Sequence, residues 1–286
     1  MYENTGGIAM ISVIMGIYNP SDPETLEQAI NSILIQTYQD FEFLIYDDGS
    51  EKEKAVVLEQ LVKKDARIRL LRGETNKGLA HALNECLAIA KGEYIARMDG
   101  DDICAPERLW KQKEFLDHHS EYAFVGCSAR LFDEEGIWGC RKMVERPTKR
   151  EIIKYSPYIH PSVMFRKNRL KEVGGYLEAK ETRRCEDYEL FMRLYSKGFY
   201  GYNLEEALFF YHESRAHYDK RNFTQRIAEM KIRYRGFQAM GVLNMKTILY
   251  VLKPVVMLFL PEKIRNTIRN KNRKYTKYEH KKRRQL

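Results

Sequence analysis

Cysteine is scarce in this sequence, and its pattern argues against two small-protein scaffolds. The 286 residues include five cysteines, an odd number, and none of them forms a C-x-x-C pair. This pattern argues against a disulfide framework and a zinc knuckle, and it is typical of proteins of the reducing cytoplasm. The amino terminus lacks a basic segment followed by a small-residue cleavage site, so we expect no signal peptide. Residues 1–10 are predicted to be a flexible lead-in.

The sequence also lacks a long apolar run, and most of the chain lacks an excess of positive charge. The apolar segment 248–260 is interrupted by Lys253 and Pro254 and falls short of the ~20 residues that span a bilayer. The net charge is +9, but residues 262–286 alone contain 11 Lys and Arg against two Glu. The rest of the chain is therefore neutral. Because a neutral body offers no extended surface to a phosphate backbone, we expect no nucleic-acid partner.

The sequence does contain a regular alternation of apolar strands and amphipathic helices. Short apolar runs predict strands at residues 11–17, 41–50, 67–73 and 93–98, and helical spacing of apolar residues predicts a helix after each of the first three. Strands that alternate with helices of about a dozen residues indicate a Rossmann-like, doubly wound, mostly parallel α/β sheet. Ligands bind such sheets beyond the carboxyl ends of the strands.

Three of these strands are followed by polar clusters, which are Tyr18-Asn19, Asp47-Asp48 and Asp99-Gly100-Asp101-Asp102. Parallel strands end at the same edge of a sheet, so we expect the clusters to converge there. Crowded carboxylates at a strand end can bind a hard divalent ion through oxygen ligands. A calcium loop of the EF-hand type does not fit, because Cys104 and Trp110 occupy two of its required positions.

After residue 102 the pattern changes. We expect a helix with Leu109 and Trp110 in the core, a hairpin over 122–143 that turns at Glu135-Gly136, a strand at 160–167 and a helix at 185–198. This half is predicted to form the pocket wall for a second substrate.

Four sequence blocks, in family order, resemble the family 2 glycosyltransferases, which have the GT-A fold. They are ISVIMGIYNP, SILIQTYQDFEFLIYDDGS, NKGLAHALNECLAIAKGEYIARMDGDD and CEDYELFMRLYSKG, and the resemblance spans residues 11 to about 212. It implies an inverting enzyme of the hexosyl- or N-acetylhexosaminyltransferase type. Such an enzyme moves a sugar from a nucleotide-diphosphate sugar, usually a UDP-sugar, to a hydroxyl.

The resemblance also implies roles for the residues of the donor side. Tyr18 and Asn19 would hold the nucleotide, with Tyr18 stacking near the base. Asp48 would hydrogen-bond the base and Asp47 would support it, although both could belong to a plain turn. In the D-x-D motif, Asp99 would contact ribose and help Asp101 bind Mn²⁺ or Mg²⁺, with Asp102 behind them. Lys77 either meets a phosphate or belongs only to the loop before a helix.

On the acceptor side the resemblance makes Asp187 the general base. Glu186 beside it could contact the acceptor, although an acidic pair is also common at a helix N-terminus. His160 either lines the acceptor site or is structural. The family often has Tyr-Arg-x-His near the phosphates, whereas this chain has YHESRAH at 211–217. Which of His212, Arg215 and His217 faces the diphosphate stays open.

These expectations divide the chain into a nucleotide-sugar-binding half at 11–102, an acceptor-binding and catalytic-base half at 103–240 and an amphipathic, basic, helical tail at 241–286. The tail either contacts an anionic membrane surface or packs on the domain with a solvated basic end. The family resemblance points to cell-surface polysaccharide biosynthesis on a glycan or lipid-linked acceptor, with the protein cytoplasmic and peripheral at the inner membrane face. The alternative, a sugar-phosphate nucleotidyltransferase, should have a Gly- and Arg-rich phosphate loop where this chain has GIYNPSDPE.

Overall fold

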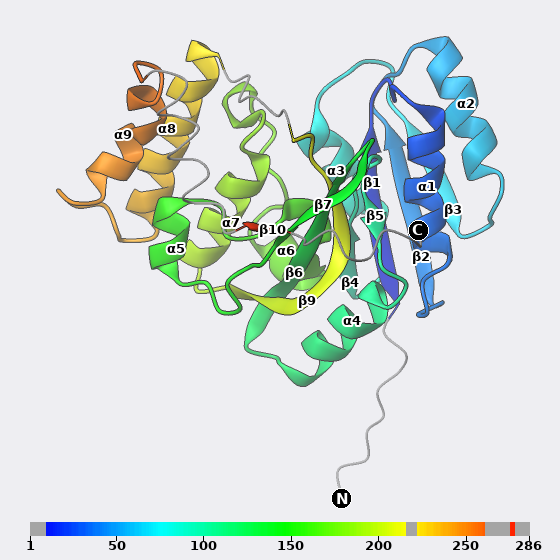
Figure 1. Cartoon of the computed structure of the whole chain (residues 1–286), viewed down its shortest axis with the longest axis horizontal. Helices are drawn as coiled ribbons and strands as arrows, with labels where there is room; N and C mark the ends of the chain where they lie inside the picture. The colour runs from blue at the N-terminus through cyan, green and yellow to red at the C-terminus, as the bar shows by residue number, and fades with distance from the viewer. Residues whose placement is uncertain (1–9, 216–221, 261–274, 278–286) are drawn as a thin grey trace, which may run out of the picture.

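A mixed ten-stranded sheet runs through the centre of the protein (Figure 1). The computed structural model describes residues 10–215, 222–260 and 275–277, so residues 1–9 of the lead-in predicted at 1–10 lie outside the described residues. The strands lie in the order β10-β7-β6-β8-β4-β1-β2-β3, and β9 pairs with β6 and β5. The predicted doubly wound α/β architecture is confirmed.

The amino-terminal half contains the parallel part of the sheet. Its strands are β1 (Ile11–Ile17), β2 (Phe41–Asp47), β3 (Ile68–Arg72) and β4 (Tyr94–Arg97), and its helices are α1 (Pro23–Leu34), α2 (Lys52–Val62) and α3 (Leu79–Ile89). Each lies where the sequence predicts it. Strands β1, β2 and β4 form because they are buried on both faces and rich in apolar residues. Helix α1 begins where Asp22 caps the amides of Glu24 and Thr25.

Helices cover both faces of the sheet. Helices α1, α2 and α4 (Arg108–His118) pack over one face, where Val13 and Ile30 belong to one buried cluster. Helices α3 and α7 (Glu186–Ser196) pack over the other, where Ile14 and Leu83 belong to a second cluster. Because the core is complete on both faces, the loops at the strand ends remain available for ligands.

The second half adds antiparallel strands and short helices. They are β5 (Ile103–Cys104), β6 (Tyr122–Asp133), β7 (Gly136–Arg141), α5 (Lys149–Lys154), a 3₁₀ turn (His160–Ser162), β8 (Met164–Arg166), α6 (Lys167–Glu172) and a second 3₁₀ turn (Lys180–Thr182). The hairpin of β6 and β7 turns at the predicted place.

Two expectations for this half are wrong. Trp110 is 44% exposed, because α4 buries Leu109 and Leu116 on its other side. The strand predicted from residue 160 begins only at Met164, because Pro161, which has no amide proton to donate to a ladder, lies in a 3₁₀ turn.

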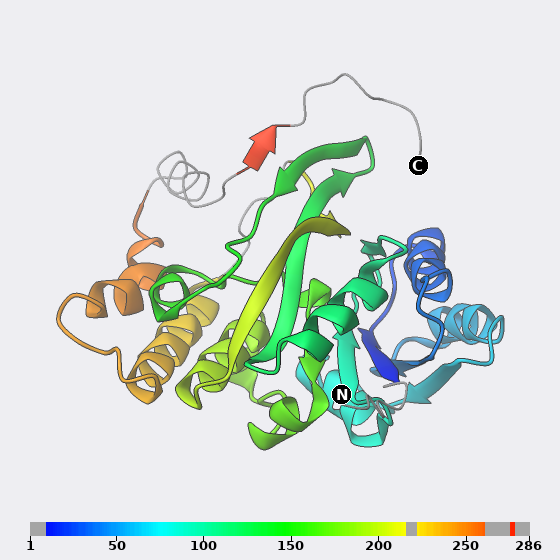
Figure 2. The same ribbon diagram turned by 90° about the horizontal axis from the view of Figure 1, so that it is seen from below.

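The carboxy-terminal part contains two strands and one helix that the sequence did not predict, and one helix in the segment predicted to be a helical tail. Strand β9 (Tyr200–His212) runs parallel to β6, and α8 (Phe223–Ala239) packs on α7. Helix α9 (Ile248–Val256) packs on α8 at the far end of the molecule from α1 and α2 (Figure 1). Strand β10 (Tyr275–Lys277) pairs with β7 and lies at the upper edge of the molecule in the view from below (red arrow, Figure 2).

Candidate functional site: the carboxyl edge of the sheet

The predicted polar clusters do meet at one edge of the sheet. Strands β1, β2 and β4 are parallel, with Ile17 beside Asp47 and Ile14 beside Arg97. The loops that follow these strands therefore leave the sheet at the same edge, as predicted for the polar clusters.

The loops after β1 and β2 are joined by hydrogen bonds. The Asn19 amide donates to Ser50 Oγ at 2.8 Å, and Asn19 Oδ1 accepts from the Glu51 amide at 2.8 Å. Tyr18 is 51% exposed, so its ring is free to pack on a planar ligand such as a nucleobase. The positions of both residues are compatible with the predicted nucleotide contact.

Asp48 organises the next loop. It is buried, and its two carboxylate oxygens accept from the amides of Lys77 at 3.0 Å and Gly78 at 2.7 Å. Gly49 has φ of 77°, and a Cβ there would lie 2.7 Å from the Thr75 carbonyl carbon, so only glycine permits this close approach. Asp48 thus holds the 75–78 loop, whose Lys77 side chain is exposed.

Asp47 supports the same turn from below. One of its oxygens accepts from the Ser50 amide at 2.9 Å, and the other lies 3.4 Å from Arg72 Nε. The carboxylate is 1% exposed. Asp47 therefore stabilises the turn and is covered from solvent, as the supporting role predicted for it would require.

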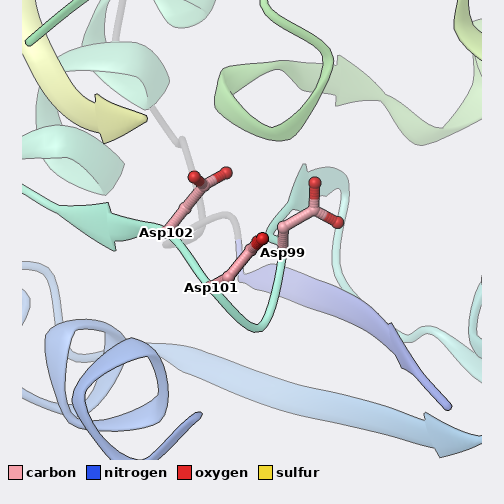
Figure 3. A group of neighbouring side chains, drawn as sticks. All are labelled: Asp99, Asp101 and Asp102. Atoms are coloured by element: carbon pink, nitrogen blue, oxygen red, sulfur yellow. The ribbon is translucent and has the colours of Figure 1, made fainter. Parts of the chain in front are cut away.

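The three aspartates after β4 form one cluster (Figure 3). One carboxylate oxygen from each of Asp99, Asp101 and Asp102 lies within 4.8 Å of the others. Gly100 lets the loop fold tightly, since a Cβ there would lie 2.5 Å from Ile17 Cδ1. The resemblance predicts that Asp102 lies behind Asp99 and Asp101, whereas the structure places its carboxylate in the same cluster.

The surroundings disfavour the charged forms of two of these carboxylates. Desolvation, followed by repulsion from Asp99, raises the pKa of Asp101. Burial, followed by repulsion from Asp99 and Asp101, raises the pKa of Asp102 well above its ordinary value. Asp102 Oδ1 accepts from the His212 amide at 2.8 Å, while its buried Oδ2 has no hydrogen-bond partner among the described residues.

A divalent metal ion fits this donor set. All candidate ligands are carboxylate oxygens, which Mg²⁺ and Mn²⁺ prefer. A cation would bind the unpartnered Asp102 Oδ2, and it would also reduce the mutual repulsion of the three carboxylates. Asp101, whose side chain is 59% exposed, leaves the cluster accessible to a ligand.

A buried arginine, which the sequence did not single out, lies against the cluster. Arg97 Nη2 is 2.5 Å from Asp99 Oδ1, and the Arg97 side chain is 2% exposed. Its Nε and Nη1 have no hydrogen-bond partner among the described residues. The sequence did contain a signal for Arg97. An arginine at the end of an apolar strand is expected to be buried, and a buried charge requires a partner.

The predicted base lies in the first turn of α7. Asp187 Oδ2 accepts a hydrogen bond from Ser156 Oγ at 3.2 Å. Burial and the neighbouring Asp187 raise the pKa of the Glu186 carboxyl. The neutral form of the Glu186 carboxyl is therefore favoured beside the predicted base.

Tyr176 links the two sides of the site. Its hydroxyl lies 2.9 Å from His160 Nε2, and the charges of Asp187, Asp99 and Glu186 all act on it. Burial, with a smaller effect of Arg97, lowers the pKa of His160 well below its ordinary value, so the imidazole is neutral. His160 is 9% exposed, which favours the structural role.

Strand β9 brings His212 to the aspartate cluster. His212 Nδ1 lies 3.8 Å from Asp101 Oδ2, and its Nε2 lies 3.7 Å from Glu134 Oε1. Arg215 instead pairs with Asp133 at 3.1 Å and with Glu135 at 2.6 Å, away from Asp101. His217 lies outside the described residues. Of the three basic candidates, His212 is the one that the structure places beside the cluster.

The chain matches known protein sequences over most of its length. The sequence profile described as Glycosyl transferase family 2 matches residues 12–174. The putative glycosyltransferase EpsE of Bacillus subtilis is 37% identical over 262 residues, which cover 91% of this chain and 93% of that protein. The amylovoran biosynthesis glycosyltransferase AmsE of Erwinia amylovora is 32% identical over 203 residues, 70% of this chain and 74% of that protein.

Solved structures share the fold. The Pyrobaculum calidifontis mannosyltransferase PcManGT, in complex with GDP-Man and Mn²⁺, has a TM-score of 0.59 and 16% identity and covers 92% of this chain and 73% of its own. Staphylococcus aureus TarS 1–349, in complex with UDP-GlcNAc, has a TM-score of 0.64 and 18% identity. The match covers 89% of this chain and 77% of the TarS chain. The predicted GT-A fold is confirmed.

Proposed function

Because the chain belongs to glycosyl transferase family 2, we propose that it is a metal-dependent, inverting glycosyltransferase. It would move a sugar from a nucleoside-diphosphate sugar to a hydroxyl of a glycan or lipid-linked acceptor in cell-surface polysaccharide biosynthesis. The observation that carries this proposal is the aspartate cluster beyond β4, with Asp102 Oδ2 buried and unpartnered among the described residues.

The donor site is proposed to follow the carboxyl edge of the sheet. Tyr18 would pack on the base, and Asn19 and Asp48 would hold the loops around it. The exposed Lys77 side chain would approach a phosphate. TarS was solved with UDP-GlcNAc and PcManGT with GDP-Man and Mn²⁺. We take a UDP-sugar as the donor, with GDP and dTDP as the alternatives to be tested.

Metal binding and proton transfer are proposed to belong to different residues of the chain. Asp99, Asp101 and Asp102 would hold the divalent ion, which would act as a Lewis acid on the leaving diphosphate. Asp187 would take the proton of the acceptor hydroxyl as that oxygen attacks the anomeric carbon from the side opposite the leaving group. Attack from that side inverts the anomeric centre. Ser156 would orient the Asp187 carboxylate through its hydrogen bond.

The named relatives and solved structures are glycosyltransferases, and they give no support to a nucleotidyltransferase. AmsE is named for amylovoran biosynthesis, which supports the assignment to polysaccharide synthesis. We place the enzyme in the cytoplasm, at the inner face of the membrane, with the tail at 241–286 in contact with anionic lipid. Among the residues that the structure describes, none of the helices is long and apolar enough to cross a membrane.

Nucleotide titration tests the proposed function. Thermal-shift and calorimetric titrations with UDP, GDP and dTDP, each with and without Mn²⁺, would compare wild type with Asp101→Ala. The matched control is Asp40→Ala, an exposed aspartate just before β2, at the opposite edge of the sheet. We expect Mn²⁺-dependent binding of one nucleotide that is lost in Asp101→Ala and kept in the control. Absence of nucleotide binding in the presence of metal would overturn the proposal.

A further inference from the structure

Helix α9 is apolar on two sides, although only one of them is packed. Val251 is 2% exposed and faces the protein. On the other side, Leu249 is 68% exposed, Leu252 42% and Val256 52%, and Phe259 beyond the helix is 79% exposed. Apart from Lys253, the helix is apolar on both sides. Neighbouring exposed apolar side chains of this kind make the outer side of α9 a candidate interaction surface.

A groove between α8 and α9 extends this apolar surface. Its volume is about 250 Å³, and it is lined by Met230, Lys231, Tyr234, Arg235, Ile248, Val251 and Leu252. Tyr234 is 46% exposed. Lys231 and Arg235, both exposed, come from the same helix as Tyr234, so the groove combines an apolar lining with cations, and Arg235 Nη1 also lies 3.5 Å from Glu181 Oε1 in an exposed ion pair.

Charge identifies the kind of partner. Residues 223–260, the described segment that contains both helices, have six Lys and Arg against one Glu, while residues 1–222 have 32 Lys and Arg against 37 Asp and Glu. An apolar surface within a strongly positive region is typical of a segment that lies on an anionic bilayer, where lipid tails cover apolar side chains and head groups meet cations.

Two other occupants fit less well. A second copy of the chain would bring two positive surfaces together, which like-charge repulsion disfavours. The carboxy-terminal segment of the chain itself is the other possible occupant, but its described residues, 275–277, pair with β7 instead.

We propose that the α8–α9 face, defined as Tyr234, Leu249, Leu252, Val256, Phe259 and the groove, is a docking surface for an anionic lipid bilayer. Acyl chains would cover the apolar residues, and lipid phosphates would meet Lys231 and Arg235. The inference deepens the proposed membrane contact of the tail at 241–286, because it assigns part of that contact to the folded helix α9 and extends it to α8. It rests on the proposed function only for the nature of the acceptor.

The position of the face has a consequence for the acceptor. Helix α9 packs on α8, and α8 packs on α7, whose first turn contains Asp187. Figure 1 shows the three helices side by side in the same part of the molecule. A bilayer bound at α9 would therefore lie in a fixed orientation relative to the proposed base, as transfer to a lipid-linked hydroxyl would require.

Vesicle co-sedimentation of the full-length chain tests the inference. The vesicles would contain phosphatidylcholine alone or phosphatidylcholine with phosphatidylglycerol. The test variant is the double substitution Leu249→Ser and Leu252→Ser. Its matched control is Ile35→Ser with Val56→Ser, two residues at the other end of the molecule that are 64% and 44% exposed. We expect the test variant to lower partitioning to phosphatidylglycerol vesicles by at least about tenfold, and the control to leave it unchanged.

Several results would overturn the inference. One is wild-type partitioning by the test variant, which would assign membrane binding to residues outside the α8–α9 face. Another is absence of wild-type binding to phosphatidylglycerol vesicles. A third is a wild-type dimer in sedimentation velocity that the test variant converts to monomer, because the face would then join two copies. Unchanged melting temperature and nucleotide binding of the test variant show that it is folded, so failure of docking is distinguishable from failure of the proposed catalytic function.

Discussion

Arg97 and Asp99 form an ion pair at the centre of the candidate site, with Arg97 Nη2 2.5 Å from Asp99 Oδ1 and the arginine side chain 2% exposed. The same guanidinium favours the charged forms of Asp101, Asp102 and Glu186. One buried cation therefore acts both on the aspartate cluster and on the acceptor side. Arg97 offsets only part of the repulsion, because burial and the neighbouring aspartates still raise the pKa of Asp101 and Asp102.

Replacing Arg97 should destabilise the protein and weaken nucleotide binding together. Arg97→Met removes the counter-ion of Asp99, and breaking a buried pair in this way costs about 3–5 kcal/mol of unfolding free energy. Arg97→Lys keeps the charge and should cost less. Urea unfolding and Mn²⁺-dependent nucleotide titration measure the two effects. A double-mutant cycle with Asp99→Asn should show non-additive nucleotide binding. Additive effects would mean that Arg97 does not act through Asp99.

Replacing Asp187 should slow the chemical step and leave donor binding intact. Asp187→Asn removes the proposed proton acceptor while it keeps the shape of the side chain, so we expect kcat to fall by about 10²–10⁴-fold. Glu189→Gln is the matched control, since Glu189 lies on the same helix and pairs with Arg193. Steady-state kinetics and nucleotide titration measure the outcome. Near-normal turnover in Asp187→Asn would assign the base to another residue.

Replacing Gly49 should disturb the loop that Asp48 holds. An alanine there would be forced into φ of 77°, with its Cβ 2.7 Å from the backbone of Thr75. Strain of this kind costs about 1–3 kcal/mol. We expect Gly49→Ala to lower the melting temperature and to weaken nucleotide binding. Gly139→Ala is the control, because its nearest neighbour lies at an ordinary 3.4 Å. Equal melting temperatures for the two variants would contradict this assignment.

The buried His160 should make stability depend on pH below neutrality. Its folded pKa is lowered well below the unfolded value, which is about 6.5. As the pH falls below about 6.5, the unfolded chain binds a proton that the folded state does not, so stability is lost. Between pH 7.5 and 5.5, wild type should lose about 1 kcal/mol more than His160→Gln. Urea unfolding at both pH values measures this difference. Parallel losses in the two proteins would show that His160 is protonated in the fold.

The sequence determined the parallel half of the fold and the edge where the site lies. Apolar runs such as Ile11–Ile17 become strands because their residues are buried on both faces. The direction of parallel strands then places Asn19, Asp48 and Asp99 at one edge. These inferences need only local periodicity and the geometry of a parallel sheet, so they could be made without coordinates.

Only the tertiary structure decided which distant residues join that edge. Strand β9 could not be predicted to lie parallel to β6, because strand pairing depends on long-range packing, yet this pairing brings His212 to Asp101. Likewise the buried position of Arg97 and the contact of Tyr176 with His160 depend on segments far apart in the chain. Sequence periodicity carries the burial pattern of one element, whereas the charge balance of a site arises from all the elements that meet there.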